Sequence, residues 1–202
     1  MKATVTLIVP CYNEEESLPI FYNAVCDVAR QLPDYRISLL LVNDGSKDGT
    51  LKVMRELPQA KSIAVMIQKE VGDKLLSGPG DDGYGPLAVM CQYRYHVMRA
   101  LDVPAACFNP PPKVDSSFMV LEKLEQPRVN VGDEEIFTRL VRSAFAMRRK
   151  TLLNNLVSGF SLNREQAAAC LAAANLSAQA RAEELSLEDF AGLAIQLQNA
   201  IR

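Results

Sequence analysis

The chain has 202 residues, 49% hydrophobic and 23% charged, fractions that are ordinary for a soluble globular protein. Its formal net charge of −2 excludes a protein that holds nucleic acid by overall positive charge, so any RNA contact must come from a local patch. Five cysteines without a CxxC pair and a single histidine exclude a His-rich metal site and favour reduced thiols in a cytoplasmic protein. We also expect no membrane span, because no apolar run approaches the ~20 residues that a bilayer requires.

The first part of the chain predicts a strand-helix-strand-helix unit with parallel strands. Residues 4–9 and 37–42 are apolar and β-rich without alternation, which is typical of parallel strands that are buried on both faces. Apolar residues at helical spacing predict a helix over 18–31, which Pro33 ends. After the second strand, a turn at 43–46 leads to a short helix over 49–56.

The rest of the chain predicts further strands and then only helices. We expect strands at 63–68, 97–102 and 114–124, helices at 69–76 and 87–95, a flexible glycine-rich loop at 78–86, and an extended loop at 104–112. Helices then follow over 134–156, 164–174 and 187–201, and Ser186 with Asp189 is typical of a helix cap.

These elements predict an α/β fold in which a hybrid, mostly parallel Rossmann-like sheet precedes a C-terminal α-helical subdomain. The predicted parts are residues 1–60, 61–125 and 126–202.

Two motifs near the N-terminus, PCYNEEESLP at 10–19 and VNDGSKDGT at 42–50, lie in loops that follow strands. With them, residues 5–51 resemble the start of a family 2, GT-A-type glycosyltransferase. The resemblance implies a nucleotide-sugar donor with Mg²⁺ or Mn²⁺. It places Tyr12, Glu14 and Asp44 against the base and ribose, with Asp48 nearby. The alternative is that Asp44, Gly45 and Ser46 only form a turn and a cap.

Three motifs follow in the rest of the chain: QKEVGDKLL at 68–76, FNPPPKVDSS at 108–117 and RRKTLLNNL at 148–156. With these motifs, the C-terminal two-thirds resembles the bacterial small-subunit rRNA adenine N6-dimethyltransferases. The resemblance implies S-adenosyl-L-methionine as cofactor and small-subunit rRNA or the 30S particle as partner. Phe108 would flank the target-adenine pocket, where an aromatic ring can stack a flipped base. The alternative is a hydrophobic plug beneath a proline-rich loop.

Polar and basic side chains supply the candidate RNA contacts, and the resemblance favours that role for them. The candidates are Lys113, Arg139, Arg142, Arg148, Arg149, Lys150 and Asn154. The charge pattern by itself favours the alternative, a solvated helix end.

Motifs that this methyltransferase family uses for its donor site do not occur in the sequence. The first strand is followed by PCYNEEE rather than a glycine-rich turn, and Asn-Leu-Pro-Tyr is absent. We therefore expect a protein related to the dimethyltransferases, with weak or no catalysis and a retained RNA-contacting part. The alternatives are a glycosyltransferase fragment and a non-functional fusion or engineered chimera. We predict no metal site, and the sequence carries no signal for an oligomeric state.

Overall fold

The computed structural model describes residues 3–57 and 61–201. The chain divides into two compact units, Met1–Lys61 and Ser62–Arg202. The end of the first predicted part, at residue 60, lies outside the described residues. No helix among the described residues is both long enough and apolar enough to cross a membrane.

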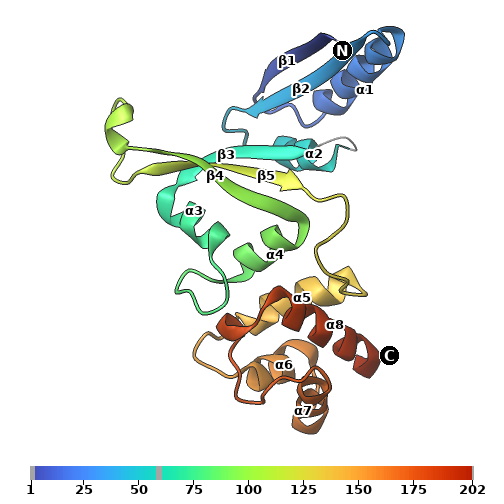
Figure 1. The fold of residues 1–202 in the computed structure, drawn as a ribbon, viewed down its shortest axis with the longest axis vertical. Helices are drawn as coiled ribbons and strands as arrows, with labels where there is room; N and C mark the ends of the chain where they lie inside the picture. Colours follow the sequence, from blue (N-terminus) through green and yellow to red (C-terminus); the bar gives the residue numbers. More distant parts are fainter. Residues whose placement is uncertain (1–2, 58–60, 202) are drawn as a thin grey trace. The chain divides into compact units, whose positions relative to one another are not determined.

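The first unit contains a two-stranded parallel sheet, as its sequence predicts. Strand β1 (Ala3–Cys11) pairs with β2 (Tyr35–Asn43) over their whole length, and helix α1 (Ser17–Gln31) connects them. Helix α2 (Thr50–Glu56) follows. Both strands therefore end at the same edge, at the loops that carry the two N-terminal motifs (Figure 1).

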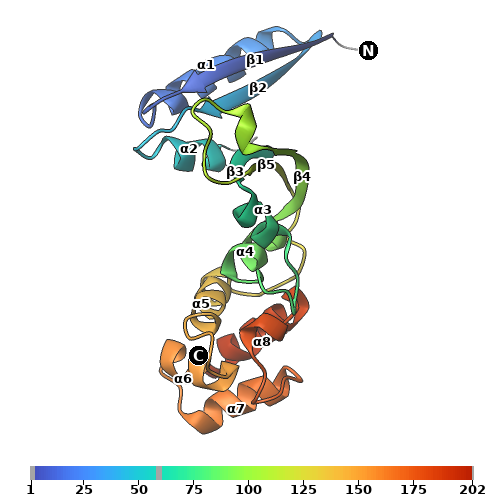
Figure 2. The same cartoon turned by 90° about the vertical axis from the view of Figure 1, so that its left-hand side faces the viewer.

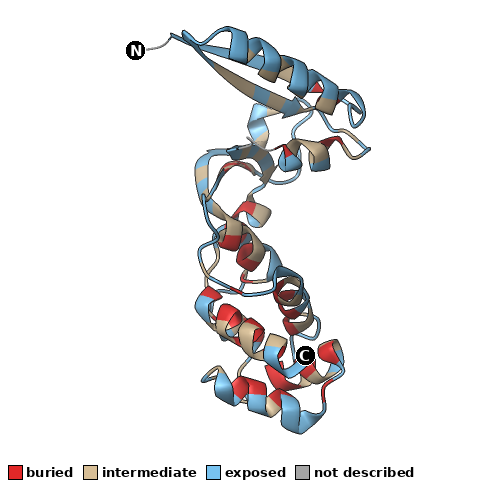
Figure 3. Cartoon of the chain, turned by 90° about the vertical axis from the view of Figure 1, so that its right-hand side faces the viewer, coloured by how far each residue is buried: buried red, intermediate tan, exposed pale blue. Residues whose placement is uncertain are grey.

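The expectation that these two strands are buried on both faces is wrong. Cys11 is the single buried residue of β1, and the side chain of Ile8 is 68% exposed. One face of the pair looks toward α1 across an apolar cleft whose walls include Val5 and Val28. The other face carries the exposed Ile8. In Figure 3, β1 is drawn mostly as exposed, whereas β2 alternates between exposed and intermediate residues. Two strands and one helix supply too little surface to cover both faces.

The second unit begins with a three-stranded antiparallel sheet. Its strands are β3 (Ser62–Gln68), β4 (Tyr95–Val103) and β5 (Ser116–Lys123), in the order β3-β5-β4. Helices α3 (Lys69–Leu76) and α4 (Pro86–Arg94) join β3 to β4. The buried side chains of β5, among them Met119 and Leu121, lie in one apolar cluster with Leu75 of α3.

The prediction of one mostly parallel sheet is therefore wrong: one sheet is a parallel pair and the other is antiparallel throughout. The connection from β4 to β5 explains the second sheet. It contains only the short 3₁₀ helix η1 (Ala105–Cys107), and neighbouring parallel strands need a long crossover, usually with a helix. A looped-back connection of this kind leaves β5 antiparallel to β4.

Helices form the remainder of the second unit. They are α5 (Glu134–Ala144), α6 (Leu152–Phe160), α7 (Arg164–Ala173) and α8 (Leu187–Ile201), with the 3₁₀ helix η2 (Ala182–Glu184) before the last. The single helix predicted over 134–156 is wrong, because the chain turns between α5 and α6. Most buried residues of the chain lie in this helical part (Figure 3), where Phe137, Leu156 and Phe190 share one core. The predicted cap before α8 is confirmed: Asp189 N donates to Ser186 Oγ at 3.1 Å, and Ser186 N donates to Asp189 Oδ2 at 2.9 Å.

Candidate nucleic-acid interface and strand-edge loops

The loops that follow β1 and β2 are hydrogen-bonded to each other. Three consecutive backbone N–H groups of the first loop, those of Asn13, Glu14 and Glu15, donate to side chains of the second. Their acceptors are Ser46 Oγ at 3.1 Å, Thr50 Oγ1 at 2.7 Å and Asp48 Oδ2 at 3.1 Å. Backbone donors at such an edge are the groups that bind anionic ligands in many α/β proteins, and here side chains occupy them.

The second loop donates in return to the first. Lys47 N donates to Asn13 Oδ1 at 2.9 Å, and Gly49 N donates to Glu15 Oε2 at 2.8 Å. Asp48 also accepts from the N–H and the hydroxyl of Thr50, and this hydroxyl hydrogen bond is the main cause that lowers the pKa of Asp48. The two loops therefore close the strand edge on themselves.

The four residues predicted to contact a nucleotide all belong to this edge. Tyr12 is exposed, and the carboxylate of Glu14 accepts a hydrogen bond from the Ser17 hydroxyl. Asp44 is exposed and donates its backbone N–H to Cys11 O at 2.9 Å. The side chain of Asp48 holds the loops together, a role that the sequence did not reveal.

A second loop region lies between β4 and β5, and it carries Phe108 and Lys113. Asp115 closes its base: its carboxylate accepts from Ala105 N at 2.9 Å, and its carbonyl accepts from Lys69 N at 2.9 Å. Phe108 is partly buried and Lys113 is exposed. The loop therefore has a fixed base and presents Lys113 to solvent.

The QKEVGDKLL motif packs α3 against the sheet at the same end. Lys69 forms an ion pair with Asp102 at 3.0 Å, and Asp102 accepts from Ser117 Oγ at 2.5 Å. The Ser117 hydrogen bond is the main cause that lowers the pKa of Asp102, and Lys69 adds to it. Gly72 lies so close to β5 that an added Cβ would be 3.1 Å from Met119 Sδ. The motifs do not predict this ion-pair cluster, because Asp102 lies outside all of them.

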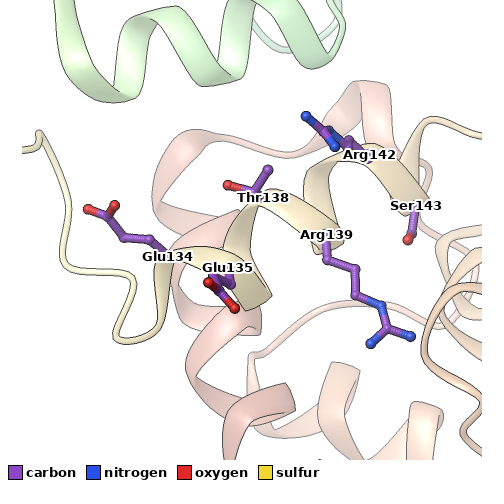
Figure 4. A pocket seen from close by; sticks show the side chains of 6 residues that line it. All are labelled: Glu134, Glu135, Thr138, Arg139, Arg142 and Ser143. Atoms are coloured by element: carbon purple, nitrogen blue, oxygen red, sulfur yellow. The ribbon is translucent and has the colours of Figure 1, made fainter. Parts of the chain in front are cut away.

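The basic residues of α5 have different environments. Arg139 donates to Gly159 O at 3.0 and 2.7 Å, and its guanidinium lies 4.7 Å from the centre of the Phe160 ring. Arg142 is exposed, and its side chain has no hydrogen bond or ion pair among the described residues. Figure 4 shows that the two arginines leave α5 in different directions, at a depression lined by Glu134, Glu135, Thr138, Arg139, Arg142 and Ser143. Arg139 therefore ties α5 to the end of α6, whereas Arg142 is free to bind an anion.

A basic turn, Ala146–Lys150, follows α5. Arg148 Nη2 donates to Asp82 O at 3.3 Å, across a separation of 66 residues. Arg149 and Lys150 are exposed, and their side chains have no partner among the described residues. Nearby, Asn154 donates to Thr151 Oγ1 at 3.1 Å and accepts from Arg164 at 3.3 Å. The basic turn thus presents two unpaired cations from an anchored backbone.

Asn155 also lies in this region, and as a polar residue of the RRKTLLNNL motif it is expected either to contact RNA or to face water, which its burial corrects. It is buried, and its Nδ2 donates to Ala144 O at 2.6 Å and to Met147 O at 3.4 Å. These hydrogen bonds hold the chain where the predicted long helix is interrupted. The only signal in the sequence was a polar side chain among leucines in the RRKTLLNNL motif.

The glycine-rich loop at 78–86 is tied to the helices, which corrects the expectation of a flexible loop. Tyr84 is buried, and its hydroxyl donates to Leu185 O at 2.9 Å. Gly80 N donates to Glu183 O at 2.8 Å. Burial raises the pKa of Tyr84 to about 12, with smaller effects from two nearby carboxylates.

The structure does not bring all the predicted RNA-binding residues together. The basic turn, Arg139, Arg142 and Asn154 belong to the helical part, whereas the loop between β4 and β5 lies at the far end of the second unit (Figures 1 and 2). Phe108 and Lys113 are therefore separate from the helical cations. Among the residues described, no group of three or more His, Cys, Asp or Glu side chains is placed to hold a metal ion.

Two solved structures have a similar arrangement of elements. A dimethyladenosine transferase from Plasmodium falciparum superimposes with a TM-score of 0.64 at 17% identity, over 96% of this chain and 90% of the other. The 23S rRNA methyltransferase ErmE superimposes with a TM-score of 0.56, also at 17% identity, over 98% of this chain and 93% of the other. The chain thus has a mixed α/β fold with a helical part of the kind found in these two proteins.

The sequence identifies the family within that fold class. Residues 28–199 match the family model described as ribosomal RNA adenine dimethylase, so the chain belongs to this family. Curated relatives carry the name "Ribosomal RNA small subunit methyltransferase A". The protein from Syntrophotalea carbinolica is 39% identical over 166 residues, which are 82% of this chain and 62% of the relative. The protein from Geobacter metallireducens is 47% identical over 132 residues, or 65% of this chain and 48% of the relative.

Two further points bear on the predicted chimera. The chain spans about half to three-fifths of the length of the curated relatives that it matches. The family match begins at residue 28, so it includes β2 and the NDGS turn, which belong to the stretch that resembles a glycosyltransferase. These findings give no support to a glycosyltransferase origin or a nucleotide-sugar donor.

Proposed function

We propose that the chain binds small-subunit rRNA through the basic turn and the neighbouring cations of its helical part. The observation that carries the proposal is the pair Arg149 and Lys150, exposed and unpaired on a turn that Arg148 and Asn155 hold in place. Cations without a protein partner are available to neutralise phosphates and to release their counterions. The family and the printed name of the curated relatives favour small-subunit rRNA among nucleic acids.

Phe108 and Lys113 would form a second, separate contact. An aromatic ring on a loop with a fixed base suits stacking on an unpaired base, and the exposed Lys113 suits a phosphate. Arg139 and Arg148 would act by holding the surface, because their guanidinium groups already bind backbone carbonyls.

S-adenosyl-L-methionine is the cofactor that the family uses, and the strand-edge loops of this chain do not fit it. The loop after β1 has no glycine, and three of its backbone donors are bonded to the loop after β2. The side chain of Glu15 also fills the space beside Gly49. We therefore infer weak or absent methyl transfer by this chain, and we derive no catalytic step. The same closed loops disfavour a nucleotide sugar.

The RNA-binding proposal is tested by removing the two free cations. We expect Arg149→Ala/Lys150→Ala to weaken binding to transcribed small-subunit rRNA roughly tenfold. The number of counterions released on binding, which is the slope of the logarithm of affinity against the logarithm of salt concentration, should fall by about one to two. The matched control is Lys123→Ala/Arg128→Ala, which removes two exposed positive charges elsewhere in the second unit. Filter binding over a range of salt concentrations measures both. An equal loss in the two variants would contradict the proposal, because it would indicate attraction by general charge.

The inference about methyl transfer is tested separately. We expect calorimetric titration with S-adenosyl-L-methionine to give no heat of binding at micromolar ligand, and radiolabelled methyl groups not to enter transcribed rRNA or 30S particles. Micromolar binding or methyl incorporation would overturn the inference and leave the RNA-binding proposal standing.

A further inference from the structure

Asn155 is a buried polar residue whose side chain bonds the backbone of the basic turn. It is 2% exposed, and one amide group donates both to the last residue of α5, Ala144, and to Met147. The carbonyl of Met147 also accepts from Lys150 N at 2.9 Å. The same carbonyl thus connects Asn155 to the residue that presents one of the two free cations.

The side-chain oxygen of Asn155 makes no such hydrogen bond. Asn155 Oδ1 is buried and has no hydrogen-bond partner among the described residues. An unpaired buried acceptor disfavours the folded state, and an apolar side chain at this position would avoid that cost. The value of an asparagine here therefore lies in its two donated hydrogen bonds, which set the path of the turn.

We propose that Asn155 is a positioning residue for RNA binding, which fixes the direction of Arg149 and Lys150 without touching RNA itself. This proposal rests on the proposed function of the basic turn. The turn has a second anchor, the hydrogen bond from Arg148 to Asp82. Loss of Asn155 therefore releases one of two attachments and misdirects the cations while the helical core stays folded.

The test uses the full chain with Asn155→Ala and filter binding to transcribed small-subunit rRNA. We expect roughly fivefold weaker binding. The number of counterions released on binding, read from the salt dependence, should fall by about one, because one phosphate contact is lost. Leu197→Ala is the control for stability: Leu197 is fully buried in α8 and has no contact role in the proposal. It should lower the melting temperature at least as much as Asn155→Ala and leave the salt dependence unchanged.

A double-mutant cycle separates positioning from stability. In the Arg149→Ala/Lys150→Ala background, Asn155→Ala should cause no further loss of affinity, because the cations that it positions are absent. Additive losses, or a wild-type salt dependence for Asn155→Ala alone, would overturn the proposal. If Arg149→Ala/Lys150→Ala itself binds normally, the proposed function of the turn fails instead. Should Asn155→Ala not fold, Asn155→Ser takes its place with the same readouts, because the shorter hydroxyl cannot reach Met147.

Discussion

Thr50 is the one fully buried polar residue of the strand-edge loops, and its hydroxyl makes two hydrogen bonds. It accepts from Glu14 N at 2.7 Å and donates to Asp48 at 2.5 Å. Thr50→Val keeps the shape but leaves the Glu14 N–H without a partner, so we expect a loss of about 1–3 kcal/mol in the stability of these loops. Faster hydrogen exchange at the Glu14 amide would reveal it. Thr6→Val, on an exposed position of β1, is the control and should leave that amide unchanged.

The burial of Tyr84 predicts that the stability of the folded state depends on pH. Its pKa is raised from 10.0 to about 12 by burial, so the folded state keeps the proton that the unfolded chain loses above pH 10. The stabilisation is complete below pH 10 and is lost as the pH rises toward 12. Spectrophotometric titration should show one of the six tyrosines ionising last, and Tyr84→Phe should remove that step. A titration curve identical in the wild type and the variant would contradict the assignment.

At the scale of the element, the contact between α3 and β5 depends on Gly72. A methyl group there would lie 3.1 Å from Met119 Sδ and 3.2 Å from Ser117 Cβ, and both neighbours are fully buried. Gly72→Ala gains about 1 kcal/mol of helix propensity. We expect overpacking to outweigh that gain and to give a net loss of about 1–2 kcal/mol in the free energy of unfolding.

Gly192 in α8 is the matched control for this prediction. Nothing lies within 4 Å of the position of its missing Cβ, so Gly192→Ala should stabilise the protein by about 0.5–1 kcal/mol. Denaturant unfolding of both variants measures the two effects. Stabilisation by Gly72→Ala would contradict the close approach of α3 to β5.

The elements that the sequence predicted well are those set by local pattern. The helices at 18–31 and 187–201 are confirmed. The signals that predict them, apolar spacing and a neighbouring cap or breaker, lie inside or directly beside each segment. The break after Ala144 could not be predicted, since no glycine or proline marks it. It depends on Asn155 and on a hydrogen bond from Arg148 to Asp82, 66 residues away. The prediction of a mostly parallel sheet failed for a related reason. β5 lies between β3 and β4 and is antiparallel to both, and its pairing with β3 joins segments that are distant in the sequence.

In the candidate site, too, local sequence predicts some features, and others depend on contacts between distant residues. Exposure of Arg149 and Lys150 follows from their charge, and the sequence identified both. It did not distinguish Arg142, which is free, from Arg139, whose guanidinium binds Gly159 O and covers Phe160. That difference depends on the packing of α5 against the end of α6. Residue type therefore predicted which side chains lie at the surface but not which of them are already bonded.

At the scale of the whole molecule, the two units differ in how much apolar surface they bury. Cys11, Leu18 and Leu57 are the buried hydrophobic residues described in the first unit, whereas a continuous core in the second includes Phe137, Phe190 and Leu197. Two-stranded sheets are marginal by themselves, and domains of about 60 residues bury too small a fraction of their surface to be robust. The second unit should therefore provide nearly all the cooperative stability of the chain.

This difference predicts how two fragments behave. Residues 62–202 should fold alone and unfold cooperatively in denaturant, whereas residues 1–61 alone should give the circular dichroism of a largely unfolded chain. In the full chain, limited proteolysis should cut the first unit before the second, because its backbone opens at a lower free energy. The prediction is contradicted by a cooperative transition from residues 1–61 alone. That result would mean that the exposed faces of β1 and β2 cost less than their apolar composition implies, or that the fragment associates with itself, which sedimentation at several concentrations distinguishes.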